Sequence, residues 1–159
     1  MFSPRATQIS YPTIRDFPAP KFSGYTKETA IAEKFQAMIK LGILNSRMKD
    51  FYDIWLISRM FDFKGEDLVN AIHKTFKNRK TDIVARPAVF DASFCRDKNK
   101  QTQWKAFLTK SKLKNAPEDF CSVVGDIERF LRPVLETIVI GKVLKKKWNA
   151  SDHWVEPTS

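Results

Sequence analysis

Histidine, cysteine and glycine are scarce in this chain, with two, two and five residues among 159. His73 and His153 stand far apart, so the sequence contains no histidine cluster that would bind a metal ion or supply a catalytic base. Cys95 and Cys121 have no C-x-x-C spacing. This argues against a zinc site and predicts two isolated thiols, small and buried, in a reducing cytoplasm. The five glycines form no phosphate-binding loop.

Long apolar runs are missing as well. No stretch approaches the roughly 18 to 20 residues that a membrane-spanning helix needs, and residues 1–5 contain no apolar signal core. We therefore expect a cytoplasmic protein without a membrane partner. An apolar content of 43% in 159 residues is enough for a single domain with a hydrophobic core.

Positive charge, by contrast, is abundant, since 28 Lys and Arg residues against 18 Asp and Glu residues give a formal net charge of +10. Such an excess attracts polyanions whatever the fold. The lysines are densest around Trp104 and Phe107, where the candidate nucleic-acid-binding residues are Lys98, Lys100, Lys105, Lys110, Lys112 and Lys114. Two interpretations stay open for this stretch: a solvated helix face with both aromatic rings in the core, or a surface that tracks RNA phosphates and stacks on bases.

Apolar periodicity and capping residues predict a mainly α fold, a helical bundle of about five helices. The expected helices span residues 27–41, 46–60, 66–79, 98–110 and 117–139, the last one kinked or divided near Leu131 by Pro133. Residues 81–97 are expected to form a connecting loop with a helical turn around 87–92. This pattern divides the chain into an extended N-terminal segment (1–25), irregular or with a short strand, a helical domain (26–140) and a basic, flexible tail (141–159).

Charged side chains stand among apolar ones on the first two expected helices. Lys34 falls on the apolar stripe of residues 27–41, and Arg47, Asp50 and Asp53 follow at intervals of three residues on the next helix. A short link brings the two stripes together, so we expect Lys34 within ion-pair reach of Asp50 or Asp53, with Arg47 in the same cluster. Because a buried charge needs a partner, the cluster is either a structural ion-pair network or the wall of a polar active site.

The motifs Ala32-Glu33-Lys34 and Arg47-x-Lys49-Asp50-x-Tyr52-Asp53 resemble the C-terminal signature of the AbiEii/AbiGii family of nucleotidyltransferase-like toxins. The resemblance extends over about residues 12–139. It implies that Lys34 lies near a triphosphate and that Asp50 or Asp53 has a catalytic role, without assigning which. The neighbours that it implies in the network are Glu33, Arg47 and Lys49. Complete members of the family would bind a nucleoside triphosphate with magnesium and transfer a nucleotidyl group to an acceptor such as tRNA.

The family's first motif, a Gly-Gly or Gly-Ser turn followed by Asp-x-Asp or Asp-x-Glu on a strand, is absent from the sequence. We therefore expect a truncated or diverged member, corresponding to the family's C-terminal portion, that lacks transferase activity alone and has no metal site or cofactor of its own. Its partners would be a separately encoded N-terminal half or an antitoxin, in a toxin–antitoxin or phage-defence system. Self-association through residues 1–25 is also expected, because an unpaired strand edge invites pairing. The alternative is a non-catalytic basic helical module that binds RNA or a protein partner.

Overall fold

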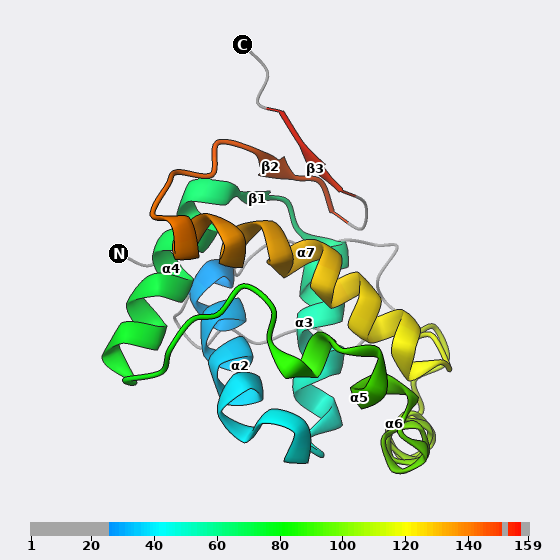
Figure 1. Cartoon of the computed structure of the whole chain (residues 1–159). Helices are drawn as coiled ribbons and strands as arrows, with labels where there is room; N and C mark the ends of the chain where they lie inside the picture. Colours follow the sequence, from blue (N-terminus) through cyan, green and yellow to red (C-terminus); the bar gives the residue numbers. More distant parts are fainter. Residues whose placement is uncertain (1–25, 151–152, 157–159) are drawn as a thin grey trace.

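The computed structural model describes residues 26–150 and 153–156. Over these residues the chain forms six α-helices and one small antiparallel sheet, which confirms the mainly α prediction (Figure 1). The extended segment predicted for residues 1–25 lies outside the described part of the chain. The helices are α2 (Lys27–Leu41), α3 (Met48–Met60), α4 (Gly65–Asn78), α5 (Ala92–Arg96), α6 (Lys98–Ser111) and α7 (Phe120–Ile140), and the strands are β1 (Phe63–Lys64), β2 (Lys147–Trp148) and β3 (Trp154–Val155).

The first helix hairpin follows its sequence signals closely. The Thr26 hydroxyl caps α2 by accepting a hydrogen bond from the Thr29 amide at 3.1 Å, and the helix ends at Gly42, which has a positive φ of 59°. A 3-10 turn (Gly42–Leu44) leads into α3, and α2 and α3 lie side by side (Figure 1). The bounds predicted for α2 are confirmed, whereas α3 begins two residues later than predicted, after Arg47.

The last helix begins later than predicted and is not divided by its internal proline. α7 begins at Phe120 and not at Pro117, because the Asp119 carboxylate accepts a hydrogen bond from the Cys121 amide and caps the helix there. Pro133 does not divide α7, which is continuous over its whole length. The proline removes one backbone donor, but tertiary packing holds the helix on both sides of it through the buried side chains of Phe130, Leu131, Val134 and Leu135.

The hydrophobic core lies where α2, α3, α4 and α7 meet. Each of these helices contributes a phenylalanine that is at most 1% exposed: Phe35, Phe51, Phe76 and Phe130. Burying one such side chain stabilises the fold by about 1.5–3 kcal/mol, so these rings account for much of the packing of the bundle. No helix in the described part of the chain is long and apolar enough to cross a membrane.

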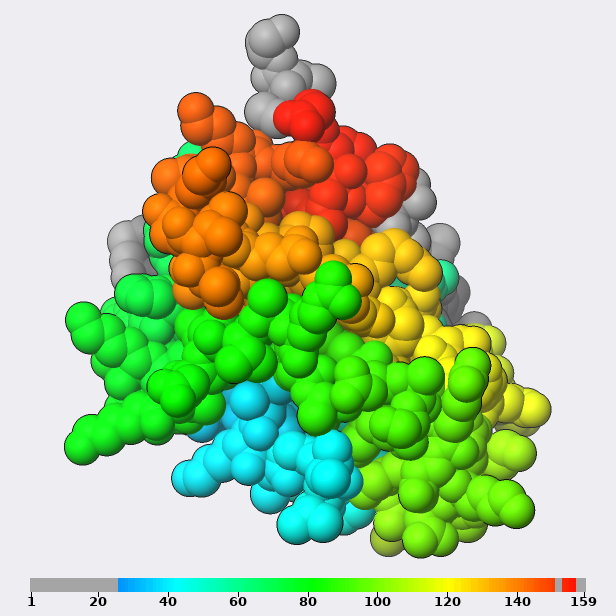
Figure 2. Space-filling model, viewed as in Figure 1, coloured from blue at the N-terminus to red at the C-terminus, as the bar shows by residue number. Residues whose placement is uncertain are grey.

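The connection between α4 and α5 closes the core over α2. The sequence predicts a loop with one helical turn here, and the structure contains a 3-10 turn (Ala88–Phe90) followed by the short α5. Phe90 is 9% exposed and its ring stacks on Phe35 with 6.1 Å between the centroids. The connection, bright green in Figures 1 and 2, runs across one face of α2. Because it lies in front of α2, that helix is only partly visible in the space-filling view.

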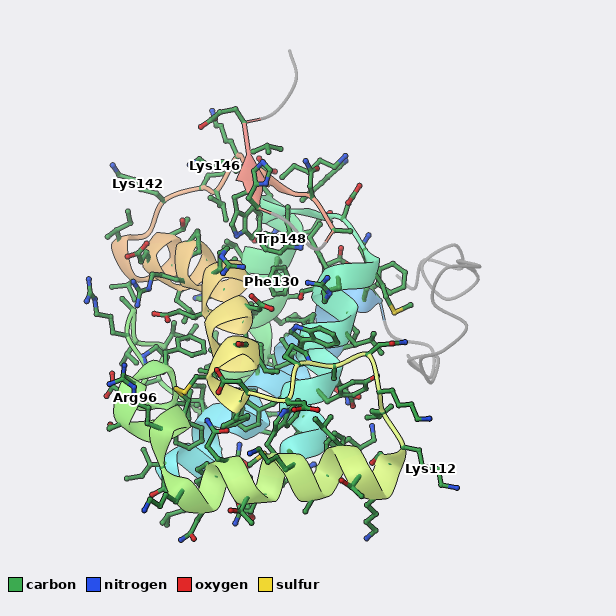
Figure 3. The ribbon with its side chains drawn as sticks, turned by 90° about the vertical axis from the view of Figure 1, so that its right-hand side faces the viewer. Arg96, Lys112, Phe130, Lys142, Lys146 and Trp148 are labelled. Atoms are coloured by element: carbon green, nitrogen blue, oxygen red, sulfur yellow. A yellow bond between two sulfur atoms is a disulfide. The ribbon has the colours of Figure 1, made fainter. Side chains whose placement is uncertain are left out.

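The C-terminal segment, predicted as a flexible tail, packs onto the helices where the structure describes it. β2 pairs with both β1 and β3, so residues near position 150 meet residues near position 63. Trp148 is 2% exposed, donates to the Ser58 carbonyl at 2.8 Å and contacts the Phe130 ring (Figure 3). Gly65 allows this close approach, because a Cβ atom there would lie 2.6 Å from the carbonyl oxygen of Leu144.

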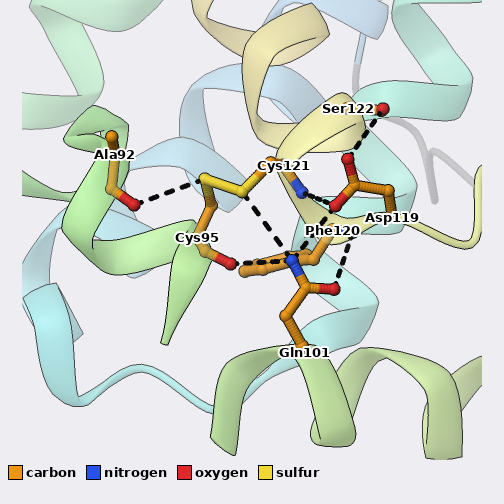
Figure 4. The surroundings of a disulfide bond; sticks show 7 residues. All are labelled: Ala92, Cys95, Gln101, Asp119, Phe120, Cys121 and Ser122. Atoms are coloured by element: carbon orange, nitrogen blue, oxygen red, sulfur yellow. Dashed lines mark hydrogen bonds between the residues drawn. A yellow bond between two sulfur atoms is a disulfide. The ribbon is translucent and has the colours of Figure 1, made fainter. Parts of the chain in front are cut away.

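Cys95 in α5 and Cys121 in α7 form a disulfide bond (Figure 4). The prediction of two isolated thiols is therefore wrong, because the fold brings α5 back onto the first turn of α7 across 26 positions of sequence. The side-chain amide of Gln101 joins the same region by donating to the Cys95 carbonyl at 2.9 Å and to the Asp119 carboxylate at 3.1 Å. Since disulfide bonds are rare in the cytosol, these cysteines no longer support a reducing compartment.

Candidate functional site

Lys34 and Lys49 bind the same oxygen of Asp53. The Lys34 Nζ lies 2.8 Å from Asp53 Oδ2, and the Lys49 Nζ lies 2.6 Å from it. Lys34 comes from α2, while Lys49 and Asp53 are four residues apart on one face of α3. The side chains of Asp53 and Lys34 are 13% and 29% exposed, whereas Lys49 reaches solvent at 73%. The predicted contact between Lys34 and one of the two aspartates is confirmed, and that aspartate is Asp53.

Asp50 has a different partner. Its Oδ2 lies 3.2 Å from Arg47 Nε, but the approach lacks hydrogen-bond geometry and the oxygen has no hydrogen-bond partner. Burial of the side chain, which is 7% exposed, raises the pKa of Asp50 above its ordinary value, and the charges of Arg47 and Lys34 offset this only in part. The expected single cluster is therefore two neighbouring units, an Arg47–Asp50 pair and a Lys34–Asp53–Lys49 triad.

Two further residues place unpaired polar atoms in the same region. Asn45 is fully buried, and its Oδ1 accepts from the Arg47 amide at 2.7 Å while its Nδ2 has no partner. The Tyr52 hydroxyl is also buried without a partner, and burial, with the charge of Asp53 adding to it, raises the pKa of Tyr52 to about 12. Lys100 donates to the Asn45 carbonyl at 2.6 Å. The sequence places Asn45 just before the second expected helix, but nothing in it predicts that this side chain is buried.

Glu33 belongs to a separate network between α2 and α4. Its carboxylate lies 3.4 Å from Arg79 Nη2, and Arg79 Nη1 donates to Gln36 Oε1 at 3.0 Å. Gln36, which is 3% exposed, in turn donates to the Thr81 hydroxyl at 2.8 Å. Sequence reasoning missed Arg79 and Thr81, because the residues they meet lie more than 40 positions away and no local pattern connects them.

The carboxylates of this site do not fit a magnesium ion, which the resemblance implies for complete family members. Asp53 Oδ2 already binds two ammonium groups, and a guanidinium adjoins Asp50, so a cation would meet positive charge at both carboxylates. In the described ranges, no three side chains of His, Cys, Asp or Glu gather in a way that would hold a metal ion.

An Asp-x-Glu pair does occur in the chain, in α7 and not on a strand. Asp126 accepts from Trp55 Nε1 at 3.0 Å and pairs with Arg129. Glu128 pairs with Arg132, one turn further along. Residues two positions apart on a helix do not face each other, so these two carboxylates are directed to different partners. They do not replace the strand-borne motif that the sequence lacks.

The six candidate nucleic-acid-binding lysines are distributed over two settings. Lys100 is half-buried against α3's N-terminal region, as described above, while the others lie exposed on α6 or just after it: Lys98, Lys105, Lys110, Lys112 and Lys114. Trp104 is fully buried, with its Nε1 donating to the Pro117 carbonyl at 2.8 Å, and Phe107 packs against it. The structure therefore favours a solvated helix face over a base-stacking surface.

The fold and these contacts define the class, a basic, mainly α protein whose first helix hairpin holds a lysine–aspartate network. The family profile described as "Nucleotidyl transferase AbiEii toxin, Type IV TA system" matches residues 1–126, so the chain belongs to this toxin family. Membership in a toxin–antitoxin family implies an antitoxin as partner. No curated protein sequence and no solved structure matches the chain. The family match includes α2 to α6 and ends within α7, so β2 and β3 lie outside it.

Proposed function

We propose that this chain is a nucleotidyltransferase-like member of the AbiEii family that does not transfer nucleotides as an isolated chain. The observation that carries the proposal is the engagement of Asp53, whose Oδ2 binds both Lys34 and Lys49. Two-metal phosphoryl transfer needs carboxylates that are free to clamp metal ions across the reacting phosphate. Asp53 instead positions Lys34, and the Asp-x-Asp or Asp-x-Glu strand that would supply metal ligands is not in the sequence.

Lys34 is proposed to face the triphosphate of a nucleotide, as the family resemblance implies. The Lys34 side chain is 29% exposed and its ammonium group is bound by Asp53. Lys49 and Arg47, whose side chains are 73% and 61% exposed, add positive charge beside it. These groups attract a triphosphate, but they offer neither a base nor a metal ligand. The missing carboxylates are proposed to come from a separately encoded polypeptide, acting with this chain in a toxin–antitoxin or phage-defence system.

The test is nucleotide transfer by the purified protein. The chain is incubated with each labelled nucleoside triphosphate, magnesium and total tRNA, with and without any polypeptide encoded directly upstream. We expect no transfer by the chain alone, and weak triphosphate binding that falls steeply with salt because it is driven by charge. Lys34→Ala should weaken this binding more than Lys74→Ala, which removes an exposed charge on α4. Transfer by the chain alone that is abolished by Lys34→Ala or Asp53→Asn would overturn the proposal.

A second candidate function is binding of RNA or a protein partner through the basic face of α6. The observation that favours it is that the five exposed lysines on or after α6 form no ion pair with any described residue. Unpaired cations are available to an anionic partner without the loss of an existing contact. Binding of a labelled RNA, measured at increasing salt, tests the RNA form of this function.

A further inference from the structure

A groove of about 620 Å³ opens where α6 ends and the chain turns toward α7. Three exposed lysines lie around it, Lys105, Lys112 and Lys114, and Figure 3 shows Lys112 at the end of α6 pointing away from the helices. Its floor is formed by aliphatic side chains that are at most 8% exposed, Leu108, Leu113 and Ala116. The groove thus combines a cationic edge with an apolar floor.

The lysines of the cationic edge are not bound in ion pairs. None of the three forms an ion pair with a residue that the structure describes, although the charge of Lys105 is near enough to help lower the pKa of Asp119. Lys105 and Lys112 are seven positions apart, which corresponds to about 10 Å along a helix axis. At the end of α6, the Leu108 and Thr109 carbonyls accept hydrogen bonds from the Lys112 and Leu113 amides, so these two carbonyls are already engaged within the chain. Carboxylates spread along a chain fit this spacing better than one compact anion.

The floor favours a peptide over a nucleic acid. Single-stranded nucleic acids are usually held by aromatic rings on which the bases stack, and no aromatic side chain lines the groove. Trp104 in the same helix is fully buried. A second copy of this chain is disfavoured as the occupant, because each copy carries a net charge of +10.

We propose that this groove docks an acidic amphipathic peptide segment of a partner protein. Carboxylates of the segment pair with Lys105, Lys112 and Lys114, and an aliphatic side chain rests on the floor formed by Leu108, Leu113 and Ala116. The inference rests on the second candidate function and specifies its partner. It is independent of the nucleotide chemistry proposed for Lys34.

The experiment measures fluorescence anisotropy of labelled probes with the full chain. The main probe is a peptide of about eight residues that contains two leucines and otherwise glutamates. In extended form this peptide is longer than the distance along the helix between Lys105 and Lys112. The comparison probes are an all-glutamate peptide, the corresponding lysine–leucine peptide and a single-stranded RNA. The groove variant is Lys105→Glu/Lys112→Glu, and Lys74→Glu/Lys77→Glu on α4 is the control, since both change the net charge equally at exposed positions.

We expect the groove variant to weaken binding of the glutamate–leucine peptide by about tenfold and the control by less than about threefold. The all-glutamate peptide should bind more weakly than the main probe, and the lysine–leucine peptide should not bind. Equal losses in the two variants, or equal affinity for the two acidic peptides, would overturn the inference. RNA binding that depends on Lys105 and Lys112 without peptide binding would also overturn it, while retaining the basic face of α6 as the functional surface.

Discussion

Asp53 balances the charges of the first helix hairpin. Two ammonium groups, from Lys34 and Lys49, lie within 2.8 Å of one carboxylate oxygen that is largely shielded from solvent. Without that carboxylate the two lysines would face each other. The partly buried Lys34 would then be the more affected of the two, because water can replace the partner of Lys49 far more easily.

Asp53→Ala should therefore lower the free energy of unfolding by about 1.5–3 kcal/mol, the range for hydrogen bonds to charged groups. Lys49→Ala, which removes a side chain that is 73% exposed, should cost less than about 1 kcal/mol. Urea denaturation of both variants and the unmodified protein provides the comparison. An Asp53→Ala protein that unfolds like the unmodified one would show that the triad contributes nothing to stability.

Asp50 should respond to pH in the direction opposite to a salt-bridged carboxylate. Its pKa is raised above the ordinary 3.8 by burial, so the folded protein holds the Asp50 proton more tightly than the unfolded chain does. The resulting stabilisation is present below the unfolded pKa and is lost as pH rises through the folded pKa. The Asp50→Asn variant has no carboxyl group at this position and does not lose stability in this way. Its free energy of unfolding, relative to that of the unmodified protein, should thus increase from acidic to neutral pH.

Urea melts at a series of pH values measure this trend. Asp82→Asn, in an exposed loop position, controls for the removal of one carboxylate. A relative stability of Asp50→Asn that falls toward neutral pH would mean that attraction by Arg47 outweighs burial at this carboxylate.

At the scale of elements, α6 is held along one side and free along the other. Gln101 bonds to the region around the disulfide near its N-terminal end, and Trp104 donates to the Pro117 carbonyl near its middle. The bond between Cys95 and Cys121 encloses the whole of α6. This arrangement fixes the inner side of α6 and leaves its lysines other than Lys100 in solvent.

Removing the disulfide with Cys95→Ala/Cys121→Ala should lower the free energy of unfolding by about 3 kcal/mol, because closing a loop of this length restricts the unfolded chain. Addition of a reductant should have a similar effect on the unmodified protein and none on the double variant. Guanidinium melts with and without reductant provide the measurement. Detection of two free thiols in the denatured, unreduced protein would contradict the bond.

At the scale of the whole molecule, the C-terminal segment completes the core. Trp148 and Trp154 lie against Phe130 of α7, and Trp154 Nε1 donates to the Phe130 carbonyl at 2.9 Å. The matched family region ends at residue 126, so both tryptophans lie beyond it. The packed core of this chain therefore includes residues beyond those that the family profile matches.

Trp148→Ala should cost about 3–5 kcal/mol, the usual range for removing a buried tryptophan side chain. Lys145→Ala, at an exposed position in the same segment, should change the unfolding free energy by less than about 0.5 kcal/mol. Chemical denaturation followed by circular dichroism compares the two. Equal stability of the two variants would mean that the C-terminal segment does not pack on the helices in solution.

The sequence by itself determined the features that local chemistry controls. Thr26 and Gly42 define both ends of α2, and apolar periodicity defines the mainly α fold. Helical spacing and a short link were also sufficient to predict the contact between Lys34 and an aspartate of α3. A capping hydroxyl, a residue with positive φ and an apolar helical stripe each depend on residues that are close together in the sequence. They can therefore be predicted without knowing which distant residues meet in the fold.

Only the tertiary structure decided which distant groups meet. The choice of Asp53 over Asp50 for Lys34, the Cys95–Cys121 bond and the contact of Trp148 with Ser58 all depend on the path of the chain. Ser58 and Trp148 are 90 positions apart, and no local pattern connects them. Such pairs form because packing the core leaves buried polar groups and aromatic rings that must find partners wherever the folded chain brings them.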